Sequence, residues 1–181
     1  MKNTPAFETV VERHGTTVLR VCRAVLGAGA DADDAWSETF LAALKAWPGI
    51  DPDTNLQAWL VTVAHRKALD ITRARARHPV PAGQAGDPGW PPGTTAERGT
   101  AGTSPRGIPG EGEPDLWAAV ALLPERQRLA IAYHYLGGLP HARTAELIGG
   151  TPEAVRRAAA DGLKTLRRTY GPDAPWEGPT P

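Results

Sequence analysis

The sequence has little that could cross-link the chain or anchor it in a membrane. Cys22 is the only cysteine among 181 residues, so neither an intrachain disulfide nor a thiolate metal cluster can form. It lies among Val21, Val25 and Leu26, where we expect a small buried hydrophobic residue rather than a nucleophile. No window approaches the ~18 apolar residues of a membrane span, and the N-terminal sequence lacks the apolar core of a secretory signal. We therefore expect a cytoplasmic protein with no membrane contact.

The sequence also lacks the patterns on which most enzymes depend. It contains no glycine-rich phosphate loop, no metal-ligand spacing and no nucleophile beside a base. We therefore expect no catalytic residues, no cofactor, no metal and no small-molecule substrate. The hypothesis that the chain is an enzyme is accordingly remote.

Net charge is absent too, because 20 Lys and Arg balance 20 Asp and Glu. The distribution is uneven, however: residues 63–78 carry five basic side chains and one acidic side chain, a net charge of +4. Such a concentrated basic stretch favours a polyanionic partner. His65 lies in this stretch, and we expect it to be a polar surface residue rather than a catalytic base.

One internal segment differs in composition from the rest of the chain. Residues 79–114 hold 8 Pro and 9 Gly in 36 positions, too few apolar side chains to offset the entropy of ordering. We interpret them as a flexible linker between a first block, residues 1–78, and a second block, residues 115–170. Residues 171–181 share this composition and are expected to form a disordered tail. No stretch alternates with a period of two, so we predict an all-α fold of two small helical domains joined by the linker.

The first block has the pattern of three helices. Apolar residues between Phe7 and Val25 recur every three or four positions, as on one buried helix face. Asp31 can cap a second helix, and Thr54 and Gln57 have capping-box spacing at the start of a third. The inner face of the second helix is expected to hold Trp36, Phe40, Ala43, Leu44 and Trp47.

The second block has the pattern of four shorter helices. Asp115 can cap the first, and Pro124 suits the first turn of the second, which a glycine pair closes. The last two run from about Pro140 to Ile148 and from Thr151 onward. Two short helices on either side of a glycine turn are the sequence form of a helix-turn-helix.

The last of these helices carries side chains suited to DNA. Residues at its start would face base edges in the major groove, where arginine pairs with guanine and glutamate accepts from cytosine, and later ones would meet phosphates. The candidates are Thr151, Glu153, Arg156, Arg157 and Lys164. The alternative is the wet outer face of a four-helix bundle. These residues support the two interpretations about equally. The capped Thr-Pro start of the helix favours DNA binding.

Three stretches then combine in a specific order. They are DDAWSETFL at residues 33–41, NLQAWLVTVAHRKALD at 55–70 and LLPERQR at 122–128. In order and spacing they resemble the extracytoplasmic-function (ECF, group 4) sigma factors of the sigma-70 family, and the resemblance covers nearly the whole chain. It implies a transcription factor that binds core RNA polymerase and directs it to promoter DNA. It also implies an anti-sigma factor as a further partner.

The resemblance implies roles for particular residues. The first stretch is similar to a polymerase-binding helix, which implies contacts from Asp34, Trp36, Ser37, Glu38, Phe40 and Leu41. The second is similar to the promoter-melting helix, which implies contacts to the −10 element from Asn55, His65, Arg66, Arg73 and Arg75. The loop 48–55 corresponds to one that receives a flipped promoter base, and positions 140–159 correspond to the helix-turn-helix of the −35 reader.

The second block departs from the family pattern at several positions. Thr144 and Gly150 stand where relatives usually carry apolar residues. The recognition helix is poorer in charge than in relatives, which commonly have more basic residues where this chain has Ala158, Ala160, Asp161 and Gly162. Asp161 would repel phosphate, and Gly162 costs about 1 kcal/mol relative to alanine in a helix interior. We therefore expect sequence preference to rest mainly on the first block. The alternative to a sigma factor is a helix-turn-helix regulator that binds duplex DNA without polymerase and uses the first block for dimerisation or effector binding.

Overall fold

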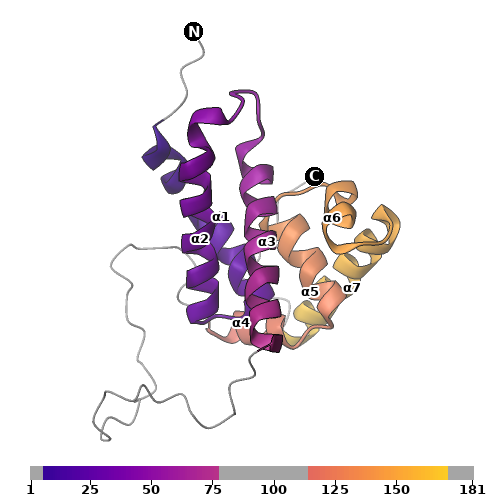
Figure 1. Cartoon of the computed structure of the whole chain (residues 1–181). Helices are drawn as coiled ribbons and strands as arrows, with labels where there is room; N and C mark the ends of the chain where they lie inside the picture. Colours follow the sequence, from indigo (N-terminus) through magenta and orange to yellow (C-terminus); the bar gives the residue numbers. More distant parts are fainter. Residues whose placement is uncertain (1–5, 78–113, 171–181) are drawn as a thin grey trace, which may run out of the picture.

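The computed structural model describes residues 6–77 and 114–170, and every regular element in these ranges is helical (Figure 1). This confirms the all-α prediction for the described part of the chain. Nearly all of the predicted linker and the whole predicted tail lie outside the described residues. The first block consists of α1 (Phe7–Leu26), α2 (Ala30–Ala46), the 3₁₀ turn η1 (Trp47–Gly49) and α3 (Leu56–Arg77).

The helix starts of the first block differ from two predictions. Asp31 lies inside the first turn of α2, because Gly29 takes the capping position and provides no side chain. At the start of α3, Asn55 Oδ1 accepts a hydrogen bond from the Ala58 amide at 3.0 Å. Asn55 is thus the cap, and the predicted capping box of Thr54 and Gln57 is wrong. Gln57 has a different partner, described below.

The second block contains four α-helices and one π-helical segment. They are α4 (Pro114–Ala121), α5 (Glu125–Ala130), the π-helical η2 (Ile131–Leu136), α6 (His141–Ile148) and α7 (Pro152–Tyr170). The helix α4 already begins at Pro114, so Asp115 lies in its first turn instead of capping it. The predicted second helix divides at Ile131, where the wider π-helical turns begin. Gly138, with φ of +70°, ends this segment, as the glycine pair predicted.

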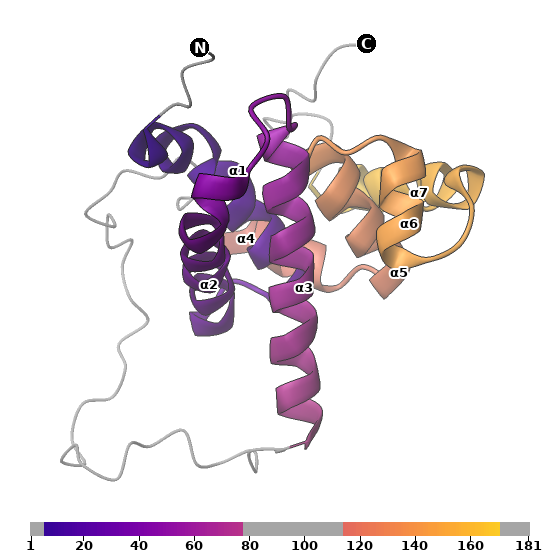
Figure 2. The ribbon, with the colours of Figure 1, turned by 45° about the horizontal axis from the view of Figure 1, so that its top comes forward.

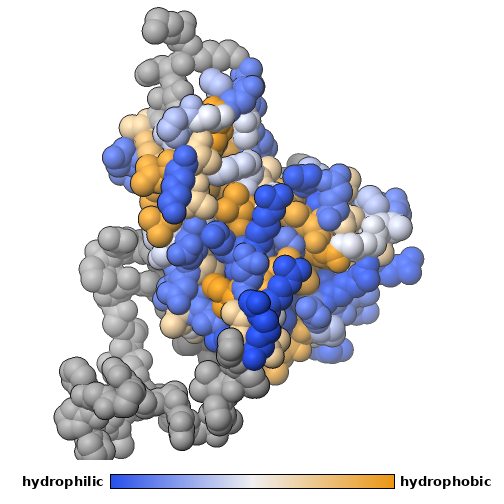
Figure 3. All heavy atoms as spheres, in the orientation of Figure 1, coloured by the Kyte–Doolittle hydropathy of each residue, from blue (hydrophilic) through white to orange (hydrophobic). Residues whose placement is uncertain are grey.

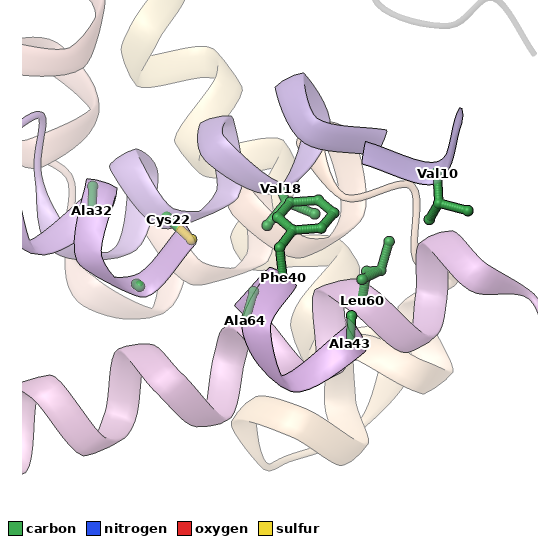
Figure 4. Packing of buried hydrophobic residues seen from close by; sticks show 9 residues of the cluster. Val10, Val18, Cys22, Ala32, Phe40, Ala43, Leu60 and Ala64 are labelled. Carbon is green, nitrogen blue, oxygen red and sulfur yellow. The ribbon is translucent and has the colours of Figure 1, made fainter. Parts of the chain in front are cut away.

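The core of the first block lies between α1, α2 and α3. Figure 4 shows Phe40 of α2 pointing toward Val18 of α1, with Leu60 and Ala64 of α3 nearby. Cys22 is buried in the same cluster, and burial raises the pKa of its thiol to about 12, which fits the expected small hydrophobic residue. Leu44 is a correction, because it was expected inside and is 51% exposed. The buried stripe of α2 passes through Phe40 and Ala43, and one further residue turns the side chain by about 100° away from it.

The two blocks are not held apart. In both views the second block lies directly beside α3 (Figures 1 and 2), and Figure 1 shows α4 at the lower end of the first block. Buried side chains of α1 and α3 share clusters with side chains of α4, η2 and the segment after η2. The two helical domains therefore pack against each other, and apolar surface on each block is covered by the other. The last turns of α3 extend past the rest of the molecule (Figure 2).

Gly162 is explained by the packing of α7. It is buried, and a Cβ at this position would lie 2.7 Å from Ile131 Cδ1 and 3.2 Å from Gln127 Cβ. The absence of a side chain therefore lets α7 approach the α5–η2 helix closely, which offsets the intrinsic cost of glycine in a helix. None of the helices in residues 6–77 and 114–170 is both long and apolar enough to span a bilayer.

Candidate functional site

The predicted polymerase-binding residues of α2 divide into two faces. Asp34, Ser37, Glu38 and Leu41 are exposed and follow one another at helical spacing, so they form one continuous outer surface. Trp36 instead turns inward: its indole Nε1 donates to the Gly15 carbonyl at 2.9 Å.

Phe40 also turns inward and is only 6% exposed. Trp36 and Phe40 contact each other, with ring centroids 4.9 Å apart, so they hold α2 in place and are not part of its outer face. Phe40 therefore acts on any partner only through the position of α2, whereas Trp36 is half-buried.

Leu44 extends this outer face, although its position in the sequence predicted a buried side chain. It is 51% exposed and lies three residues after Leu41, which is 50% exposed, so two leucines and two acids share the surface. The spacing of Leu41 and Leu44 was the available signal. On the front of the molecule, hydrophobic surface is visible on the α2 side, while over α3 and the second block hydrophobic surface is interspersed with many hydrophilic side chains (Figure 3). An apolar patch beside carboxylates suits a protein partner that carries basic and apolar side chains.

A shallow groove of about 250 Å³ separates α2 from the C-terminal half of α3. Glu38 and Lys67 lie on opposite sides, and their charged atoms are 3.3 Å apart. Ile71 and Ala74 supply its apolar floor. Because this ion pair is exposed, it holds the two helices together only weakly and leaves Glu38 available to a partner.

The basic residues of α3 are exposed and engaged with nearby acids. Arg73 lies 3.9 Å from Asp70 one turn earlier, and Arg75 reaches Asp31 of α2 at 2.5 Å. Arg66 is exposed as well. Arg73 and Arg75 lie in the last turns of α3, which project into solvent, so the structure leaves this part of the helix accessible to a phosphate backbone.

His65 does not lie on the surface, which corrects the expectation from the sequence. It is 9% exposed, and its Nδ1 is 2.7 Å from the hydroxyl of Tyr133 in the second block. Burial lowers the pKa of His65, the positive charge of Arg66 lowers it further, and a hydrogen bond to the Leu147 backbone opposes the shift. Among the predicted −10 contacts, His65 is therefore covered in this conformation. The sequence signal that could have indicated this burial is the pattern of apolar and polar residues on the second face of α3, which packs on the second block.

This burial predicts a pH dependence of stability. The neutral form of His65 is favoured in the folded protein, so its contribution is present above the ordinary pKa and is lost as the pH falls through that range. We expect the free energy of unfolding, measured by urea titration, to fall between pH 7.5 and pH 5.5. The variant His65→Gln should reduce this slope. The slope should not vanish, since burial also lowers the pKa of His14 and His141. An equal slope in the variant would contradict the prediction.

The recognition helix α7 presents the predicted DNA-facing residues to solvent. Glu153, Arg156, Arg157 and Lys164 are all exposed and share one face. Thr151 caps the helix, with its Oγ1 accepting from the Ala154 amide at 3.2 Å, as predicted. The opposite face packs on α5 and α6: Val155, Ala159, Ala145 and Ala130 form one buried cluster. The predicted residues thus come together on one helix face.

The turn before α7 explains why glycine stands at position 150. Gly149 and Gly150 have φ of +80° and +102°, a region that residues with side chains rarely adopt. Arg126 crosses this turn and donates from a guanidinium nitrogen to the Gly149 carbonyl at 3.0 Å. A Cβ on Gly150 would lie 2.0 Å from that nitrogen. Arg126 therefore helps to fix the start of the recognition helix, a role that its position in the sequence did not reveal.

Thr144 provides a test of the packing of α6. It is 0% exposed, and its hydroxyl has no hydrogen-bond partner within the described residues. A buried hydroxyl without a partner costs free energy, so Thr144→Val should raise the free energy of unfolding by about 1 kcal/mol. Denaturant unfolding would measure it. Thr39→Val is the matched control, because Thr39 is equally buried but donates to the Ala35 carbonyl at 2.6 Å. Equal effects at the two positions would contradict this account.

The fold and these surfaces define a class: an all-α protein with an acidic-apolar face on one block, a basic helix beside it and a helix-turn-helix on the other block. Sigma-70 region 2 matches residues 10–78, and sigma-70 region 4 matches residues 114–166. The chain is 30% identical to the ECF RNA polymerase sigma factor ShbA of Streptomyces griseus, over 82% of this chain and 79% of that protein. The chain therefore belongs to the ECF sigma factors of the sigma-70 family.

Other relatives are longer proteins, and the alignment with this chain covers only part of their length. The chain is 28% identical to the ECF sigma factor SigG of Mycobacterium tuberculosis over 93% of its own length, but it spans only 52% of SigG. It matches 38% of the sigma factor CnrH of Cupriavidus metallidurans, at 36% identity.

Solved structures agree in fold. The sigma factor RpoE, in complex with the anti-sigma factor NepR from Bartonella quintana, superposes with a TM-score of 0.63 at 18% identity. That match covers 93% of this chain and 98% of the other. CnrH in complex with the cytosolic domain of CnrY gives a TM-score of 0.57 at 21% identity, over 95% and 92% of the two chains.

Proposed function

We propose that this protein is a group 4 sigma factor that binds core RNA polymerase and directs it to a set of promoters. The observation that carries the proposal is the presence in one chain of both sigma regions, each with its expected functional face in solvent. In the first block the polymerase face is Asp34, Ser37, Glu38 and Leu41, to which we add Leu44. Trp36 and Phe40 support it from within.

Promoter contacts are assigned to both blocks. Asn55, Arg66, Arg73 and Arg75 would lie along the −10 element, and His65 would join them once it is uncovered. On the second block Thr151, Glu153, Arg156, Arg157 and Lys164 would face the −35 element. The chain itself carries out no catalysis in this proposal: bond formation belongs to the polymerase, in the cytoplasm where promoter and polymerase meet.

An anti-sigma factor is proposed as a second partner, supported by the folds of RpoE and CnrH, whose structures were solved with NepR and with CnrY. A pull-down of the tagged full chain from native cells is expected to recover core polymerase and such an inhibitor.

Reconstitution tests the central claim. Purified chain added to core polymerase on fragmented genomic DNA should give transcripts that start at defined sites, and core enzyme alone should not. Failure to form any complex with core polymerase would overturn the proposal and favour a regulator that binds DNA by itself.

A further inference from the structure

Two histidine rings stack on each other at the start of the helix-turn-helix. His134 belongs to η2 and His141 is the first residue of α6; their ring centroids are 3.7 Å apart and the ring planes are inclined by 26°. Both side chains are half-buried. The stack therefore joins the inner part of the second block to α6, which lies with α7 on the side away from the first block (Figures 1 and 2).

The segment between the two rings is held in place by hydrogen bonds. His134 Nδ1 lies 2.7 Å from the Leu139 carbonyl. A carbonyl oxygen only accepts, so Nδ1 carries a hydrogen and Nε2 is the atom of this ring that can gain a proton. Gln57 Nε2 donates to the Gly137 carbonyl at 3.0 Å, and Leu139 is only 1% exposed. The stacked arrangement is thus fixed by the fold.

The charges that act on this pair in the free chain are positive. Burial lowers the pKa of His141, and the charges of His134 and of Arg156 on α7 lower it further. Arg156 is exposed, and Glu153, one turn earlier on α7, is exposed as well. Tyr135 contacts His134 edge to face, with ring centroids 4.8 Å apart. The neutral form of the pair is therefore favoured when no anion is bound.

The charged groups on the other packed elements have partners of their own. Arg143 and Glu146 form an ion pair with each other on α6. From α5, Arg126 donates to the Gly149 carbonyl at the far end of α6, and Arg128 donates to the Ala121 carbonyl. The side chains that α1 contributes to the buried clusters with η2 are apolar. Arg156 is thus the fixed charge that acts on the pair.

Two protons on this pair would be unfavourable, whereas one would be tolerated. Two imidazolium rings with centroids 3.7 Å apart would repel each other strongly. A single imidazolium over a neutral ring is instead stabilised by the ring's electrons. We therefore expect the pair to take up one proton as a unit.

A DNA phosphate would reverse the electrostatic surroundings of the pair. In a helix-turn-helix the first helix crosses the phosphate backbone while the second enters the major groove. A phosphate that pairs with Arg156 would place negative charge near His141, at the N-terminus of α6. Negative charge at this distance favours the protonated ring.

We propose that the stacked His134–His141 pair takes up one proton when the second block binds the DNA backbone, so that the DNA affinity of this block rises as the pH falls. This rests on the assignment of α7 to DNA in the function proposed above. The sign follows from linkage: the complex binds more protons than the free chain, so affinity increases between the pKa of the complex and the lower pKa of the free pair.

Three substitutions separate this titration from general effects of pH. His141→Gln removes the ring that gains the charge, and His141→Arg replaces it by a permanent cation that can still stack on His134. His14→Gln is the matched control. His14 is also half-buried and its pKa is also lowered, by burial and by Arg13, but it lies on α1 of the first block.

The test uses the full chain without polymerase and a rhodamine-labelled duplex of mixed sequence, because phosphate contacts do not depend on sequence. Fluorescence anisotropy would give the affinity at constant salt between pH 8 and pH 6. Over this range the affinity should rise at least about fivefold more in the unsubstituted chain and in His14→Gln than in His141→Gln, within the limit of tenfold per pH unit for one proton. His141→Arg should bind at pH 8 as tightly as the unsubstituted chain at pH 6, and its pH dependence should match that of His141→Gln.

Nuclear magnetic resonance of the histidine ring protons provides an independent measurement. The titration midpoint of His141 should move to higher pH when the duplex is added, and that of His14 should not. Circular dichroism checks helix content; if His141→Gln loses it, His141→Arg and the resonance titration decide. An equal rise of affinity in the unsubstituted chain and His141→Gln, or an unchanged midpoint of His141, would overturn the proposal and leave the proposed function intact. Absence of any duplex binding at low salt would instead overturn the assignment of the second block to DNA, and the proton uptake with it.

Discussion

Replacing Asp34 and Glu38 together by alanine is expected to lower the affinity of the chain for core RNA polymerase by about 100-fold. Both carboxylates lie on the exposed face of α2, one turn apart, beside the exposed leucines. Loss of two charged contacts at the centre of a protein interface costs about 3 kcal/mol, which corresponds to this factor. The salt bridge of Glu38 with Lys67 is exposed, so its loss adds little to the effect on folding. Fluorescence anisotropy of labelled chain titrated with core enzyme would measure the affinity.

The control removes the same charge elsewhere. Glu8 and Glu12 are exposed on α1, and their replacement by alanine should leave the affinity within about twofold. If the double variant of α2 bound core enzyme as well as the control, the polymerase face would have to lie on another part of the molecule. A regulator that acts without polymerase would keep its DNA affinity in both variants and bind core enzyme in neither.

Replacing Arg156 and Arg157 by alanine is expected to weaken binding of the polymerase complex to DNA by about 10- to 100-fold. Both guanidinium groups are exposed on the outer face of α7, which we propose to face DNA. If they meet mainly phosphates, the slope of log affinity against log salt should fall by about two, and the preferred sequence should change little. Selection of bound fragments from a randomised duplex library at several salt concentrations would measure both quantities.

Arg13→Ala with Lys45→Ala is the matched control, because both residues are exposed and lie on the first block. It changes net charge equally and should leave the salt slope near that of the unsubstituted chain. A loss of preference at particular base pairs of the −35 element in the α7 variant would contradict the idea that specificity rests on the first block. In that case Arg156 or Arg157 would be a direct base contact.

The helices of this chain were largely readable from local sequence. The apolar periodicity between Phe7 and Val25 predicted α1, and glycine pairs marked the ends of η2 and α6, because helix faces and helix ends depend on residues within a few positions. The capping role of Thr151 was predictable for the same reason, because a cap also depends on residues within a few positions. Where two residues competed for one cap, as Thr54 and Asn55 did, the prediction of Thr54 was wrong, since the cap depends on backbone geometry.

The candidate binding surfaces were predicted only in part from the sequence. The six residues assigned to polymerase lie on one helix, but only the structure divides them into an exposed set and an inward pair, Trp36 and Phe40, because side-chain direction depends on what α2 packs against. Leu44 was assigned to the wrong side for the same reason. Arg126 was missed altogether, because its contact with Gly149 joins residues 23 positions apart.

By itself, then, the sequence determined the all-α class, the order of the helices and the family of the protein, all of which rest on short-range pattern. Only the tertiary structure decided that the two blocks meet, that His65 is covered by Tyr133 and that Gln57 binds the second block instead of capping its own helix. These contacts join residues 68 and 80 positions apart. They form because apolar faces on both blocks leave water together, and no local pattern specifies which two faces will do so.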